Sequence, residues 1–137
     1  MVGLLRRESA DLARVIMSHI DRTIFDDDRL FRLADSGVVL ELDLFGMETT
    51  HYKWSDIDLP NDGERLRVLR KLIDRGHLRQ IAISHDICYR SRLSHFGGHG
   101  YGHIFRNIVP LMLRREFDQA EIDTVLIETP ARLLTFV

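Results

Sequence analysis

The stretch Gln80-Ile81-Ala82-Ile83-Ser84-His85-Asp86 is a short apolar run that ends in a histidine and an aspartate. An apolar run of this length, bounded by polar residues, is typical of a buried strand. Imidazole and carboxylate groups can bind a metal ion or transfer a proton. The stretch therefore predicts a buried strand, Gln80–Ser84, that is followed directly by chemically active side chains.

Two earlier runs repeat this design. They predict strands over Val15–His19 and Val38–Phe45, so that His19 and Asp43 also lie at or near strand ends. Helical patterns separate the three strands, with N-cap signals at Asp26, at Asn61 with Glu64, and later at Asp118 with Glu121. Strands that alternate with helices predict parallel βαβ units, whose carboxyl ends meet at one edge of the sheet. Sites in such folds form at that edge.

Composition indicates one globular domain of ordinary character. The chain has 137 residues, 45% of them hydrophobic and 29% charged, with a net charge of −2. This balance gives no electrostatic reason to expect a nucleic acid or a membrane as partner. The only cysteine, Cys88, excludes an internal disulfide, and a small buried side chain is favoured there over a nucleophile. There is no long apolar run and no signal peptide pattern, so we expect a cytoplasmic protein.

Two residues are the main candidates for chemistry. His19 ends the first strand and could bind a zinc-like ion, or could be a hydrogen-bonded histidine that closes the strand. Asp86 follows the third strand, where a carboxylate needs a metal ion or hydrogen-bond donors; a structural aspartate is the alternative. Beside a metal-activated water, Asp86 could also accept a proton. Asp43 is expected to hydrogen-bond to the same site and to contact the substrate there, while Glu41 is interpreted as a satisfied interior polar group.

The segment after Asp86 is rich in glycine and histidine. His95, His99 and His103 are four residues apart, but the glycines between them disfavour a continuous helix. We therefore expect a loop at the edge of the sheet, in which His99 or Tyr101 contacts a substrate. The glycines match neither the dinucleotide-binding nor the P-loop pattern, so nucleotide binding is not predicted.

Several motifs together resemble the phosphotriesterase-related proteins of the amidohydrolase superfamily. They are Val15-Ile16-Met17-Ser18-His19-Ile20-Asp21-Arg22-Thr23, Leu42-Asp43-Leu44-Phe45-Gly46, Ile83-Ser84-His85-Asp86, Gly97-Gly98-His99-Gly100-Tyr101 and Pro130-Ala131-Arg132-Leu133-Leu134-Thr135-Phe136. The resemblance implies an α/β fold, the C-terminal part (about strands 6 to 8 with their helices) of a TIM-type (β/α)8 barrel with parallel strands. Residues 1–137 would form a single partial domain, because a full barrel takes about 250 residues.

The same resemblance implies a metal-dependent hydrolase with two divalent metal ions, usually zinc. His19 would be the metal ligand of strand six, and Asp86 the ligand of strand eight and the catalytic proton acceptor. The remaining ligands of the family, a His-x-His pair among them, have no counterpart in this chain. Arg22 and Leu44 stand where bacterial phosphotriesterases have an acid–histidine relay, so cleavage of a lactone, ester or amide is at least as plausible as that of a phosphoester.

These observations lead to one main hypothesis and one alternative. The chain is expected to be an incomplete part of a zinc hydrolase for a small-molecule substrate, with little activity alone. Its site would be completed by the missing N-terminal half-barrel or by a homo-oligomer. The alternative is a small doubly wound α/β module without hydrolase activity, with Asp43 or Asp86 as a phosphoacceptor or ligand contact.

Overall fold

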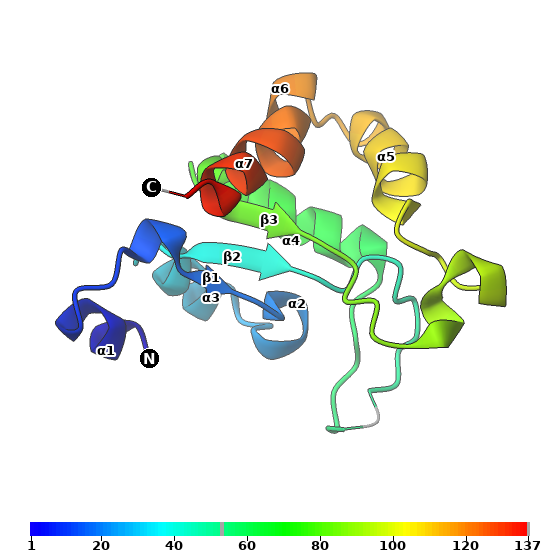
Figure 1. The fold of residues 1–137 in the computed structure, drawn as a ribbon, viewed down its shortest axis with the longest axis horizontal. Helices are drawn as coiled ribbons and strands as arrows, with labels where there is room; N and C mark the ends of the chain where they lie inside the picture. Colours follow the sequence, from blue (N-terminus) through cyan, green and yellow to red (C-terminus); the bar gives the residue numbers. More distant parts are fainter. Residues whose placement is uncertain (53, 137) are drawn as a thin grey trace.

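The protein is described here from a computed structural model that covers residues 1–52 and 54–136. Its centre is a sheet of three parallel strands in the order β1-β2-β3. The strands are β1 (Ile16–Met17), β2 (Val39–Leu42) and β3 (Ile81–Ile83). In register, Ile16 pairs with Val39, and Leu40 pairs with Ile81. The parallel sheet that the sequence predicts is therefore confirmed (Figure 1).

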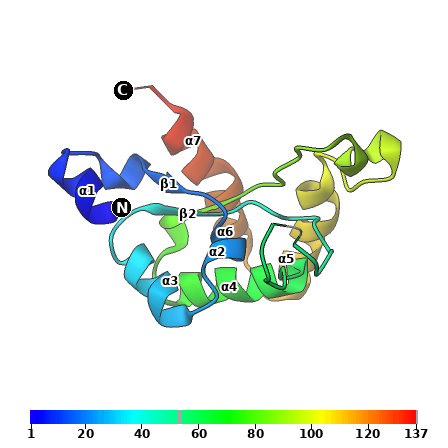
Figure 2. The same cartoon turned by 90° about the horizontal axis from the view of Figure 1, so that it is seen from below.

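Helices connect and cover the strands. They are α1 (Val2–Arg7), α2 (Ile20–Thr23), α3 (Asp27–Ala34), α4 (Asp62–Asp74), α5 (Val109–Arg114), α6 (Gln119–Asp123) and α7 (Thr129–Leu134). Short 3-10 helices lie at Leu12–Arg14, Leu78–Gln80, Arg90–Arg92 and Ser94–Phe96. Figure 2 shows α3 and α4 together on one side of the strands. No helix in residues 1–52 or 54–136 is long and apolar enough to cross a lipid bilayer.

The helix N-termini follow the predicted capping signals. Asp26 accepts the backbone N–H of Arg29, and Asn61 accepts that of Glu64. Asp118 and Glu121 bond reciprocally in a complete capping box. These local bonds satisfy amide groups that would otherwise lack a partner in the first helical turn.

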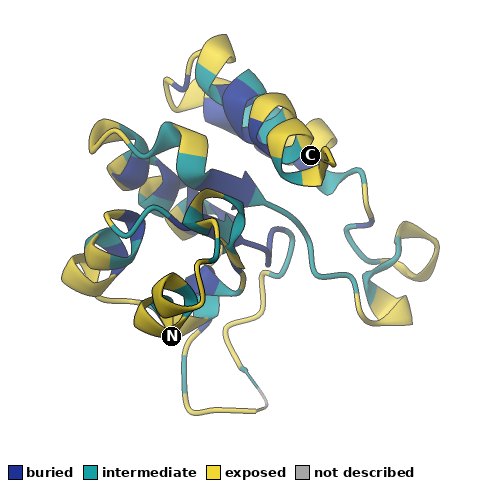
Figure 3. Cartoon of the chain, turned by 60° about the vertical axis from the view of Figure 1, so that its left-hand side comes forward, coloured by how far each residue is buried: buried dark blue, intermediate teal, exposed yellow. Residues whose placement is uncertain are grey.

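The strands are shorter than the predicted runs, for a local reason that is clearest at β1. His19 adopts a left-handed backbone conformation with φ of +60°, and α2 begins at the next residue, so the strand cannot reach His19. The N-terminal helix α1 is short and lies on the surface. It stops at Arg7, and none of its residues is buried (Figure 3).

Two helical segments widen into π-helical turns just before a proline. Ile104–Ile108 precedes α5, which contains Pro110, and Thr124–Glu128 precedes α7, which contains Pro130. A proline inside a helix has no N–H to donate and its ring crowds the preceding turn, so a wider turn accommodates it. The segment from Gln119 to Leu134 is therefore contiguously helical, although it contains Pro130.

The two faces of the sheet differ in character. One face packs against the helices through fully buried side chains such as Leu40, Leu42 and Ile81. On the other face Glu41 lies between two serines and accepts hydrogen bonds from Ser18 at 2.5 Å and from Ser84 at 3.1 Å. Glu41 is thus a satisfied polar group, as its alternation with leucines predicts.

Candidate active site at the carboxyl edge of the sheet

His19 follows β1 at the carboxyl edge of the sheet and is held there by Asp43. The backbone N–H of His19 donates to Asp43 Oδ2 at 3.1 Å, and His19 Nδ1 lies 2.8 Å from the same oxygen. The His19 side chain is 37% exposed, whereas that of Asp43 is 6% exposed. A carboxylate that contacts one imidazole nitrogen and leaves the other available is the usual arrangement behind a metal-binding histidine.

Asp43 follows β2 and is buried in contact with His19. Burial raises the pKa of Asp43, and the nearby acids Asp21 and Glu41 act in the same direction. The hydrogen bond and the charge of His19 oppose this effect and lower the pKa. Its contact with His19 indicates that Asp43 orients this imidazole; direct contact between Asp43 and a substrate stays a prediction.

Asp86 follows β3 and also has an unusual backbone conformation, with φ of +44°. Its carbonyl oxygen accepts a hydrogen bond from Arg92 Nη1, and its Oδ2 lies 3.9 Å from the same nitrogen. Only four non-glycine residues among those described have positive φ, and both candidate metal ligands are among them. Such conformations cost energy and cluster at functional sites. The backbone conformations of His19 and Asp86 therefore support the same functional assignment as their side chains.

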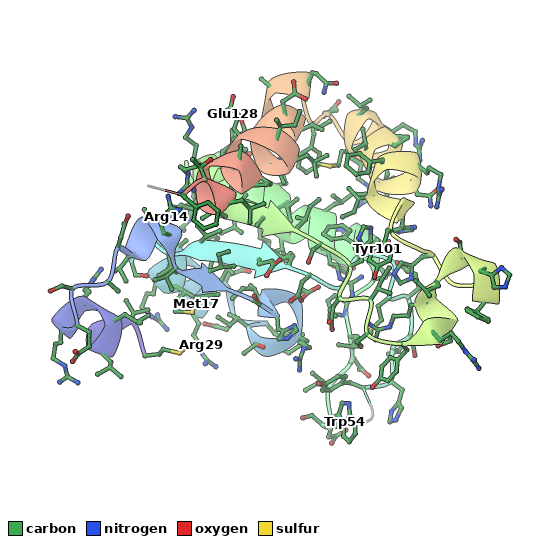
Figure 4. All side chains as sticks on the ribbon, in the orientation of Figure 1. Arg14, Met17, Arg29, Trp54, Tyr101 and Glu128 are labelled. Carbon is green, nitrogen blue, oxygen red and sulfur yellow. The ribbon has the colours of Figure 1, made fainter. Side chains whose placement is uncertain are left out.

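A cavity of about 370 Å³ opens beside Asp86, between the loops that follow β2 and β3. Its wall includes Arg22 from α2, Tyr52 and Trp54 from the loop after β2, and Arg92 from the loop after β3. Figure 4 shows Trp54 near the outer end of the first of these loops. Cys88 also lines this cavity and is exposed, so the expected small buried side chain is wrong. A volume of this size fits a small molecule.

The histidines after β3 divide into two groups. His85, His99 and His103 lie together, with ring centroids 5.5 to 6.3 Å apart, whereas His95 is exposed beside Phe96. Burial, followed by the charges of neighbouring histidines, lowers the pKa of both His85 and His99. His85 Nε2 accepts the backbone N–H of Ile104. Residues 95–103 form no continuous helix, as the glycines between the histidines predict.

His99 packs against Gly46, and Tyr101 lies nearby in the sequence but faces outward. A Cβ atom at Gly46 would meet the His99 ring at 2.4 Å. Tyr101 is 68% exposed in the segment between β3 and α5 (Figure 4). His99 therefore joins the loop after β3 to the end of β2, and contact of His99 or Tyr101 with a substrate stays a prediction.

We expect Gly46→Ala to destabilise the protein more than Gly76→Ala. Both glycines have positive φ, +90° and +86°, but a Cβ at Gly76 meets no atom within 4 Å. Gly76→Ala should therefore cost only the backbone strain, about 1–2 kcal/mol. Gly46→Ala should add about 1–3 kcal/mol through the clash with His99. Urea denaturation of the two variants measures the difference, and equal losses of stability would contradict the contact.

A buried charge network lies under this edge, and sequence analysis missed it. Arg65 in α4 is fully buried, and its Nε and Nη1 donate to Asp21 Oδ2 and Asp62 Oδ1, each at 2.8 Å. Asp21 also accepts the backbone N–H of Leu44 at 3.1 Å. Arg65 is thus a salt-bridge partner in the interior and does not lie on a solvated helix face. In the sequence, the spacing of Asp62 and Arg65, three residues apart in the first turns of α4, is the signal that these two side chains could pair.

The network continues from Asp62 to the loop after β2 and to the histidine group. Asp62 accepts the backbone N–H of Gly46 at 2.9 Å and lies 2.7 Å from His103 Nε2. Burial alone would raise the pKa of Asp62, but the hydrogen bonds from Gly46 and His103, with the charge of Arg65, hold it below its usual value. An ionised Asp62 thus fixes both loops that surround the cavity.

The residues present fit part of a metal site. His19 has the carboxylate support expected of a metal ligand, and Asp86 offers an oxygen donor of the type that zinc accepts. Residues 1–52 and 54–136 contain no group of three or more histidine, cysteine or acidic side chains arranged to hold an ion. A catalytic zinc ion usually has three protein ligands, so these two residues supply at most part of the set.

Comparisons with known proteins agree with this geometry. A sequence model of the phosphotriesterase family matches residues 1–134. N-acetyltaurine hydrolase of Salmo salar is 46% identical over 137 residues, which are 99% of this chain and 39% of that protein. The chain thus spans about two fifths of the length of the curated relatives that it matches.

Two solved structures have the same fold over almost the whole chain. A resiniferatoxin-binding protein from Rhodobacter sphaeroides superimposes with a TM-score of 0.90 at 30% identity, covering 96% of this chain and 37% of that one. The phosphotriesterase homology protein from Escherichia coli gives a TM-score of 0.84 at 30% identity, covering 98% and 43%. The architecture is therefore part of a TIM-type barrel, and the sequential strand order does not support the doubly wound alternative. The chain belongs to the phosphotriesterase family.

Proposed function

We propose that this chain forms part of the active site of a metal-dependent hydrolase that cleaves a small amide. The observation that carries the proposal is the pair of residues His19 and Asp86. His19 lies two residues after the end of β1 and Asp86 three residues after the end of β3, at the carboxyl edge of the parallel sheet, and both have strained backbone conformations. The curated relatives named N-acetyltaurine hydrolase favour an amide over a lactone or a phosphoester as the scissile group.

His19 and Asp86 would hold the metal, which we propose to be zinc, together with ligands from outside the described residues. When bound, the divalent ions would activate water and polarise the scissile carbonyl. Asp43 keeps the His19 imidazole in one orientation through the contact at Nδ1. Asp86 accepts the proton of the attacking water and returns it to the leaving amine, while Arg92 fixes the backbone of Asp86.

A chimeric protein tests this function. The segment of the Salmo salar N-acetyltaurine hydrolase that matches this chain is replaced by residues 1–137, and release of taurine from N-acetyltaurine is measured with added zinc. We expect the chimera to turn over the substrate and the isolated chain to show little activity, because two ligands hold zinc weakly. A folded chimera that cleaves neither N-acetyltaurine nor a lactone would contradict the proposal.

A further inference from the structure

The cavity beside Asp86 is lined by two arginines and by aromatic side chains. Arg22 and Arg92 bring two positive charges to its wall, whereas Asp86 is the acidic residue described there. Tyr52, Trp54 and Tyr89 supply apolar surface with polar edges. Sites for small molecules commonly combine such a mainly apolar wall with a few fixed charged groups that orient the ligand.

Arg22 is the arginine of this cavity whose positive charge could bind an anionic ligand. Its Nη1 donates to the Tyr52 hydroxyl at 2.5 Å, and its guanidinium carbon lies 5.2 Å from the centre of the Tyr52 ring. Within residues 1–52 and 54–136, no carboxylate forms an ion pair with Arg22. The contact with the Tyr52 hydroxyl and ring holds the guanidinium in place without forming an ion pair with a carboxylate.

Arg92, by contrast, contacts Asp86. Its Nη1 donates to the Asp86 carbonyl and lies 3.9 Å from the Asp86 carboxylate, and its Nη2 lies 3.9 Å from the Met47 sulfur. The two arginines thus have different roles. Arg92 holds the backbone of Asp86, which is the proposed proton acceptor. Arg22 places a positive charge without a carboxylate partner at another part of the cavity wall.

We propose that this cavity binds the anionic end of a small acyl amide, and that Arg22 is the residue that selects it. The amide carbonyl would lie toward Asp86, and the sulfonate or carboxylate would lie against Arg22, since the Asp86 carboxylate repels an anion. Guanidinium groups bind such oxyanions through two parallel N–H donors. Tyr52 is the positioning residue for Arg22. The inference deepens the proposed function by naming the substrate class and its determinant.

Binding to the complete 137-residue chain tests the subsite without turnover. The probes are N-acetyltaurine, N-acetyl-β-alanine and the neutral N-ethylacetamide, titrated by NMR. We expect the two anions to bind at resonances of the cavity and the neutral amide to bind at least about 10-fold more weakly, the value of one charge-assisted hydrogen bond. Comparison of the two anions shows whether sulfonate or carboxylate is preferred, and equal binding of all three probes overturns the inference.

Substitutions identify the residue. Arg22→Gln should weaken anion binding about 10- to 100-fold, Arg22→Lys should weaken it less, and Tyr52→Phe should have an intermediate effect because the guanidinium loses its anchor. Arg7→Gln, at an exposed arginine of α1, is the matched control and should bind like the unmodified chain. Circular dichroism checks that each variant is folded. If Arg22→Gln is unfolded, Tyr52→Phe becomes the decisive variant. Unchanged anion binding in the folded variant overturns the inference.

Kinetics of the chimera separate this inference from the proposed function. Arg22→Gln should raise KM for N-acetyltaurine and reduce its preference over N-ethylacetamide, with a smaller effect on kcat. A chimera that cleaves N-acetyltaurine but keeps its full preference without Arg22 refutes the anion subsite and leaves the hydrolase standing. An inactive chimera with Arg22-dependent anion binding to the chain refutes the hydrolase and leaves the subsite standing.

Discussion

Asp86→Asn should lower kcat of the chimeric hydrolase for N-acetyltaurine by about 10²- to 10⁴-fold, the usual contribution of a positioned proton acceptor. Asparagine keeps the size of the side chain and tolerates positive φ at least as well as aspartate, so the backbone at φ +44° is preserved. The substitution removes a negative charge from the proposed ligand set and leaves an amide that cannot accept the proton of water. Taurine release under saturating substrate is the measurement.

The matched control for this substitution is Asp28→Asn, which removes the same charge from an exposed position in the first turn of α3. It should leave kcat unchanged. Zinc content, measured for each purified chimera, distinguishes a lost ligand from a lost proton acceptor, because the first lowers occupancy and the second does not. An Asp86→Asn chimera with normal turnover would show that this carboxylate takes no part in the chemistry.

The sheet and the residues at its carboxyl edge could be predicted because their signals are local. Three apolar runs of strand length, separated by capped helices, require parallel connections, and parallel strands place His19, Asp43 and Asp86 at one edge. The exact strand ends could not be predicted from the apolar runs. The end of β1, for example, depends on the left-handed backbone of His19, and a histidine does not indicate such a conformation as a glycine does.

The support beneath the edge could not be predicted, because it joins residues that are distant in sequence. Asp21 and Arg65 are 44 positions apart, and each alone resembles an ordinary polar residue of a helix surface. Only the packing of α4 against the loop after β2 buries both. Arg22 is a similar case, because its position beside Tyr52 depends on a contact across 30 residues. Sequence motifs pointed to His19 and Asp86 as candidate ligands, whereas the charged groups around them could be placed only in the structure.

Arg65→Met should lower the free energy of unfolding of the 137-residue chain by about 3–5 kcal/mol, the usual cost of breaking a buried ion pair from one side. Methionine approximates the length of the apolar stem, so the main change is the loss of the guanidinium. Asp21 and Asp62 would then be buried without their cation, and the Met47 carbonyl would lose its donors. Urea denaturation at neutral pH gives the free energy.

Two further variants show that the loss comes from unpaired charge. Arg67→Met, two positions later in α4, removes an exposed arginine paired with Glu64 and should change stability little, because exposed ion pairs contribute little. Adding Asp21→Asn to Arg65→Met should recover part of the lost stability, since one uncompensated carboxylate is neutralised. If instead Arg65→Met costs no more than Arg67→Met, the network does not stabilise the fold. The loops at the cavity would then be held by other contacts, such as that of His99 with Gly46.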